Sequence, residues 1–70
     1  MKIEDTCYVL ADEIDGETVY LTSEYFFNND IRKASRFKNH TVAMYTKSFI
    51  YQKYKWDLNV VELKITYEWQ

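Results

Sequence analysis

The sequence predicts an α+β fold in which a three-stranded antiparallel sheet carries a short and a long helix packed on one face. The sheet consists of a β-hairpin and a C-terminal strand, so the element order is ββααβ. Three observations support this prediction: an Asp15-Gly16 pair between two β-rich runs, a capping residue before a long apolar-periodic stretch, and a strict alternation near the C-terminus. The 70 residues form a single domain, 1–70.

The hairpin is predicted from the runs 6–14 and 17–22, which meet at Asp15-Gly16. An Asp-Gly pair supplies the positive φ angles of a type I′ turn, whose twist matches that of the flanking strands. This turn places Leu10 opposite Leu21 and Asp12 opposite Val19. The expected core face carries Tyr8, Leu10, Ile14, Val19 and Leu21, and the other face carries Val9, Ala11, Glu13, Thr18 and Tyr20.

Two helices are expected between the hairpin and the last strand. Asn29 or Asp30 caps a short helix over 31–37, and Asn39 or Thr41 caps a longer helix that reaches about Lys55 or Trp56. The expected buried face of the longer helix carries Val42, Ala43, Phe49, Ile50 and Tyr54, and its outer face carries Met44, Lys47, Ser48, Tyr51 and Lys55.

The final strand is predicted from residues 61–69, in which every odd position is apolar and every even position is polar or charged. Period-two alternation of this kind indicates one buried and one solvated face. The apolar set is Val61, Leu63, Ile65, Tyr67 and Trp69.

Composition argues against several classes of function. A chain of this size has little volume for a deep substrate cavity, which disfavours an enzyme, unless an oligomer assembles the site. Cys7 is the one cysteine, His40 the one histidine and Gly16 the one glycine, so we expect no zinc site, no phosphate-binding glycine loop and no cofactor. No secretory signal or membrane span is recognisable, and the expected location is the cytoplasm.

Charge is strongly segregated along the chain. Residues 1–30 carry a net charge of −7, residues 31–56 carry +7 and residues 57–70 carry −2. One interpretation is internal, with basic helices lying against an acidic hairpin; the other is that one or both ends meet a charged partner.

Two candidate binding surfaces follow from the second interpretation. The first is the acidic hairpin, with an aromatic side chain for apolar contact: Asp12, Glu13, Asp15, Glu17 and Tyr20. The alternative is a nucleic-acid or partner face in the basic segment 31–56: Arg32, Lys33, Arg36, Lys38, Lys47, Tyr51 and Lys55.

The order of local motifs also resembles a known group of proteins. A YVL strand, a DG turn, FFNNDIRKASRF, a helix near HTVAMY and a last strand VVELKITYEW together resemble the short accessory proteins of phages and prophages of low-GC Gram-positive bacteria. The shared pattern is aromatic-x-x-x-[DN]-Ile-x-x-Ala-x-x-Phe. The resemblance implies a non-enzymatic protein, in the cytoplasm of a bacterial host, that binds and blocks or redirects a host protein such as a CRISPR nuclease.

The leading functional hypothesis is therefore an interaction protein that inhibits or redirects a nucleic-acid-handling host protein by steric or charge-mimic contacts. The alternative is a nucleic-acid-binding accessory or regulatory module that uses the basic segment. Either protein is expected to act as a monomer or homodimer without a membrane.

Overall fold

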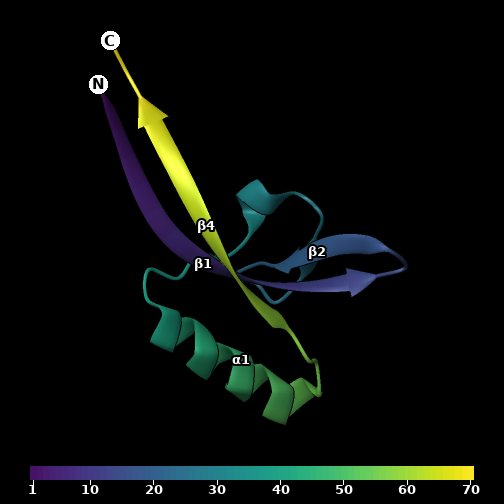
Figure 1. The fold of residues 1–70 in the computed structure, drawn as a ribbon. Coiled ribbons are helices and arrows are strands. Elements are labelled where there is room, and N and C mark those ends of the chain that lie inside the picture. Colours follow the sequence, from purple (N-terminus) through teal and green to yellow (C-terminus); the bar gives the residue numbers. More distant parts are fainter.

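The structure is a computed structural model that describes residues 1–70. Its elements in order are β1 (Lys2–Ile14), β2 (Glu17–Leu21), β3 (Phe27–Asn28), the 3₁₀ turn η1 (Ile31–Lys33), α1 (His40–Tyr54) and β4 (Asn59–Glu68). The strands form one antiparallel sheet in the order β3-β2-β1-β4. Figure 1 shows α1 below the point at which β1 and β4 cross.

The predicted fold class is wrong in its details, although the protein is α+β. The sheet has four strands instead of three, and there is one α-helix instead of two. The missed strand is β3, which pairs with β2 because a tight loop reverses the chain after Thr22. In this loop the Thr22 amide donates to the Phe26 carbonyl at 2.8 Å, and Tyr25 adopts a φ of 61°.

The expected short helix over 31–37 is also wrong, since it is a single 3₁₀ turn. Asp30 caps this turn as predicted, with its side chain accepting from the Arg32 amide. The chain then straightens at Ala34, and Phe37 exchanges two hydrogen bonds with Tyr8 of β1. Backbone bonding to the sheet therefore takes the place of helical bonds in this segment.

The turn of the hairpin and the ends of the long helix agree closely with the prediction from the sequence. Asp15 and Gly16 have φ angles of 53° and 80°, the two positive values of a type I′ turn, and Asp12 lies opposite Val19 as predicted. The Asn39 side chain caps α1 by accepting from the Thr41 amide, and Lys55 ends the helix in the left-handed conformation.

The core is small and lies between α1, β1, β2 and the segment before β4. Leu10, Leu21, Ile50 and Leu58 form its buried cluster, and Phe27, Phe37, Trp56 and Val60 pack against it. The rings of Phe27 and Trp56 pack edge to face with their centres 5.1 Å apart, and the ring of Tyr54 stacks on Trp56 with the centres 4.6 Å apart. These contacts connect the end of α1 to β3.

Burial departs from the expected one-sided pattern. Val9 and Ala11, expected on the face away from the core, are buried, whereas Ile14 on the expected core face is exposed. On α1, Ala43 and Ile50 are buried as predicted, but Val42, Phe49 and Tyr54 are exposed, and Lys47 of the expected outer face is half-buried.

The molecule divides into a body and a projecting ribbon. We call residues 1–6 and 64–69 the ribbon; they form a two-stranded extension with both termini at its end (Figure 1). The remaining residues form the body. The ribbon gives the molecule its elongated dimensions of 46 × 27 × 19 Å. All of residues 1–6 are exposed, and Tyr67 and Trp69 are half exposed instead of buried.

Candidate functional site

The acidic hairpin projects from the body on the side away from the ribbon (Figure 1). Asp15 lies in the turn, while Asp12 and Glu17 share one face with Val19 and Ile14, and Glu13 shares the other with Thr18. Tyr20, opposite Ala11, lies on the face of Glu13 and is half-buried. The five predicted hairpin residues are therefore gathered on one element but divided between its two faces.

Local polar contacts order part of this hairpin without neutralising it. The Asp12 carboxylate accepts from the Glu13 amide at 2.8 Å, and the Glu17 carboxylate accepts from the Asn29 side chain at 2.7 Å. The ion pairs of the structure join Lys2 to Glu4, Arg32 to Asp30 and Lys47 to Asp57. None includes a hairpin carboxylate, so the basic segment does not neutralise the acidic hairpin through direct pairs.

The basic segment is divided between two places. Lys33, Arg36 and Lys38 are exposed in the segment before α1. Lys53 and Lys55 lie at the C-terminal end of α1, about 20 Å from its N-terminal end along the helix axis. The outer face of α1 does bring together Lys47, Tyr51 and Lys55, and the Lys55 ammonium lies 5.7 Å from the centre of the Tyr51 ring.

Two of the predicted cations are already engaged within the chain. Arg32 donates from Nε and Nη2 to the two carboxylate oxygens of Asp30, both at 3.0 Å. This pair, together with the Arg32 amide, lowers the pKa of Asp30, and the same side-chain bonds raise the pKa of Arg32. The Lys47 ammonium lies 3.8 Å from Asp57. Both pairs leave less positive charge for phosphate contacts.

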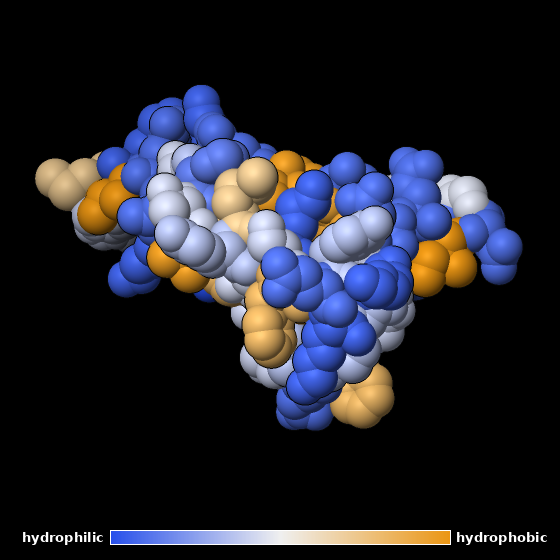
Figure 2. Space-filling model, turned by 90° about the horizontal axis from the view of Figure 1, so that it is seen from below, coloured by the Kyte–Doolittle hydropathy of each residue, from blue (hydrophilic) through white to orange (hydrophobic).

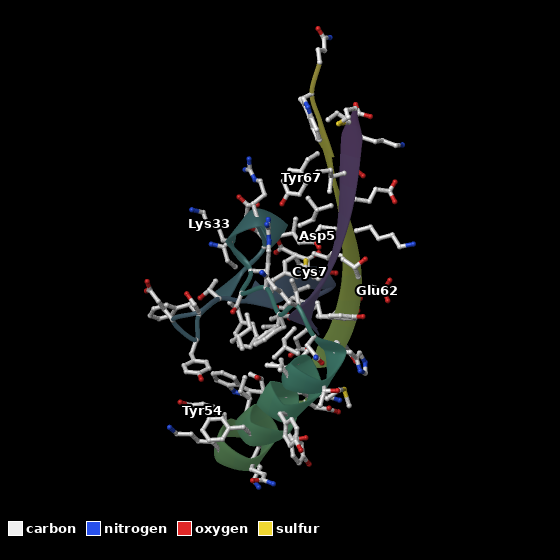
Figure 3. The ribbon with its side chains drawn as sticks, turned by 90° about the vertical axis from the view of Figure 1, so that its left-hand side faces the viewer. Asp5, Cys7, Lys33, Tyr54, Glu62 and Tyr67 are labelled. Atoms are coloured by element: carbon white, nitrogen blue, oxygen red, sulfur yellow. The ribbon has the colours of Figure 1, made fainter.

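Sequence reasoning expected the apolar residues of the last strand to be buried, and so it missed a third surface, the exposed apolar face of the ribbon. Ile3 lies opposite Tyr67 and Asp5 lies opposite Ile65, so these four side chains share a face. In Figure 3, Tyr67, Asp5 and Cys7 lie on one side of the ribbon, together with Lys33 of η1, and Glu62 lies on the other. The sequence signal that could have revealed this exposed surface is the length of the strands compared with the length of the helix. The predicted strand 61–69 spans about 30 Å, whereas the predicted helix from Thr41 to about Lys55 covers about 22 Å.

Apolar groups on the underside of the molecule do not form one continuous surface. Figure 2 shows the hydrophobic atoms in separate groups between hydrophilic ones. The exposed large side chains of α1 include Val42, Met44, Tyr45 and Phe49. This side therefore offers scattered contacts and no single apolar groove.

No group of three or more His, Cys, Asp and Glu side chains is placed to hold a metal ion, and no helix is long and apolar enough to cross a membrane. Comparison of the chain with protein-family models, with curated proteins and with solved structures finds no match.

Proposed function

We propose that the protein is a non-enzymatic inhibitor of phage or prophage type, which acts in the cytoplasm of a bacterial host by binding a nucleic-acid-handling protein. The target class is a defence enzyme such as a CRISPR nuclease. The observation that supports this proposal most strongly is that Asp12, Glu13, Asp15 and Glu17 form no ion pair, although the same chain carries a basic segment.

Electrostatics explains why such a hairpin suits a nucleic-acid-binding groove. Four carboxylates on one short hairpin repel one another and contribute little to the stability of the fold. Their field attracts a positively charged surface and increases the rate of association. A groove that holds phosphates offers such a surface, and the hairpin carboxylates occupy the phosphate positions in our proposal. Tyr20, beside Glu13, supplies apolar contact area.

The proposal is tested by charge reversal on the hairpin. The triple variant Asp12→Lys, Glu13→Lys, Glu17→Lys is compared with wild type by affinity capture from a bacterial lysate and mass spectrometry. A control variant, Glu4→Lys, Asp5→Lys, Glu24→Lys, makes the same change in net charge outside the hairpin. We expect only the hairpin variant to lose the captured protein, with its melting temperature nearly unchanged.

A competition experiment then tests the mimicry itself. An added oligonucleotide should release the captured protein, since both ligands occupy the same groove. Capture that survives both the hairpin variant and the oligonucleotide would contradict the proposal.

The alternative function, nucleic-acid binding through the basic segment, is favoured by the exposed Lys33, Arg36 and Lys38. It makes a distinct prediction, because phosphate contacts release counterions and weaken steeply with salt. Binding of DNA or RNA at low salt that falls with added salt and weakens in Arg36→Ala would assign the function to this segment. Arg32→Ala should matter less than Arg36→Ala, since Arg32 is held by Asp30. Under our leading proposal no such binding is expected.

A further inference from the structure

The outer edge of β4 is a second unpartnered feature, separate from the acidic hairpin. β4 is the last strand of the sheet and pairs only with β1. At the ribbon end, Met1 and Trp69 exchange backbone hydrogen bonds at 3.0 and 3.1 Å. Because bonding direction alternates along an antiparallel strand, the odd residues of β4 bond to β1. The N–H and C=O groups of Glu62, Lys64, Thr66 and Glu68 therefore point away from the sheet.

We propose that this edge pairs with the same edge of a second copy of the chain, with the two-fold axis at Thr66. The pairing is antiparallel and joins the two four-stranded sheets into one. The ribbon would then have a third strand, whereas a two-stranded ribbon with no further partner is only marginally stable in water.

Charge selects this register among those that the backbone allows. Among the even residues of β4, whose backbone groups point away from the sheet, Thr66 lies opposite Thr66 of the second copy. Lys64 lies opposite Glu68 of the second copy, and symmetry gives this pair twice. A two-fold axis at Lys64 would instead place Lys64 of one copy opposite Lys64 of the other. A two-fold axis at Ile65 would place Glu62 of one copy opposite Glu68 of the other. Like charges directly opposite one another are destabilising, whereas opposite charges and Thr–Thr pairs are stabilising.

The apolar face fits the same register. Ile65 lies opposite Tyr67 of the second copy, and Leu63 lies opposite Trp69 of the second copy, each pair occurring twice. Aromatic side chains beside branched aliphatic ones are favourable cross-strand pairs. Tyr67 and Trp69 are 50% and 45% exposed in the single chain, so this contact would remove apolar surface from water.

A centre at Leu63 is the one other register with two opposite-charge pairs, in which Glu62 lies opposite Lys64. It requires residues 59–61 to accept a partner strand. Those residues lie in the body, where Val60 packs against the core cluster and β4 contacts α1. The register centred on Thr66 uses only residues 63–69, which lie in or next to the ribbon.

The free edge of β1 is a weaker candidate for the same role. Phe37 already occupies this edge at Tyr8, which leaves only residues 2–6 for a partner. Pairing of β1 edges would also place Asp5 on the apolar face of the contact. The longer β4 edge is therefore the one that fits a second copy.

Sedimentation of the full chain tests the dimer and its charge pairs. Wild type should shift with concentration from the 8.5 kDa chain to twice that mass. Lys64→Glu and Glu68→Lys should each raise the dimer dissociation constant about tenfold or more. The double variant Lys64→Glu, Glu68→Lys should dimerise more tightly than either single variant, because it re-forms the pairs between copies. Thermal melting shows that each variant is folded.

Oxidative cross-linking tests the position of the axis. In Thr66→Cys the two Cα atoms would be about 5.5 Å apart, within the range of a disulfide. A cross-linked dimer on a non-reducing gel is therefore expected. The control Glu62→Cys should stay uncross-linked, since its two copies lie eight residues apart along the strands, and the native Cys7 is buried.

Three outcomes would overturn the proposal. They are a monomer at every soluble concentration, a dimer that the charge variants do not affect, or a cross-link in Glu62→Cys but not in Thr66→Cys. A capture experiment that loses the host protein in the hairpin variant would leave this result unaffected, since the hairpin and the ribbon are separate elements.

Discussion

The body and the ribbon both contain parts of β1 and β4, yet the burial of the alternating side chains of these strands differs between the two regions. In the body, Val9 and Leu10 are adjacent in β1 and both are fully buried. In the ribbon, Ile3 and Tyr67 face each other and each is at least half exposed. Alternation therefore predicts a strand and its two faces, but the neighbouring elements decide whether a face is buried.

The largest expected difference between the two regions is the cost of truncating an aliphatic side chain. Leu10→Ala should lower the free energy of unfolding by about 3 kcal/mol, because it leaves a cavity in the core. Ile3→Ala should lower it by less than about 1 kcal/mol, since Ile3 is exposed. Urea denaturation measures both values, and equal costs would show that the ribbon is packed as tightly as the body.

A smaller difference is expected for introduced charge along β4. Leu63 is half-buried opposite the buried Cys7, so Leu63→Asp should cost about 2 kcal/mol. Tyr67→Asp should cost less than about 1 kcal/mol, and Glu62→Lys on the other face should be nearly neutral. Thermal melting of the three variants at a concentration at which the protein is monomeric measures this gradient. Similar melting temperatures for the first two would place the boundary between body and ribbon elsewhere.

The smallest expected effect is a pH dependence within the body. Arg32 holds the pKa of Asp30 below its ordinary value of 3.8, so the cap of η1 contributes stability that is fully present above this value. This contribution is lost as the pH falls through the lowered pKa. Carboxyl titration by NMR should show the pKa of Asp30 rising in Arg32→Ala and rising less in Lys33→Ala. A pKa of Asp30 that is the same in all three proteins would exclude the pair.

Features set by local geometry could be predicted from the sequence. The Asp15-Gly16 turn requires positive φ angles that few other residues accept, and it also fixes the register of Asp12 opposite Val19. Asn39 caps α1 because its short side chain reaches the Thr41 amide. These features depend on residues that are close in sequence.

Features that depend on distant contacts could not be predicted in the same way. β3 arises from backbone pairing across a loop, and the 31–37 segment follows β1 through Phe37 instead of continuing as a helix. In the candidate site, the division of Asp12 and Glu13 between two faces follows from the turn and was predicted, whereas the lack of ion pairs between the hairpin and the basic segment depends on distant contacts and was left open. The edge of β4 was missed because a sequence does not show which strand is the last in a sheet.

Cys7 lies where the ribbon meets the body, opposite Leu63, and only 5% of its surface is accessible. A thiol reagent can reach it only when the groups that cover this face of the sheet move away, so the labelling rate at a given reagent concentration reports how often the junction opens locally. Because Cys7 is the one cysteine in the chain, a single modification per molecule follows this motion without any engineered probe. The unmodified protein thus contains its own chemical reporter of local opening at this junction.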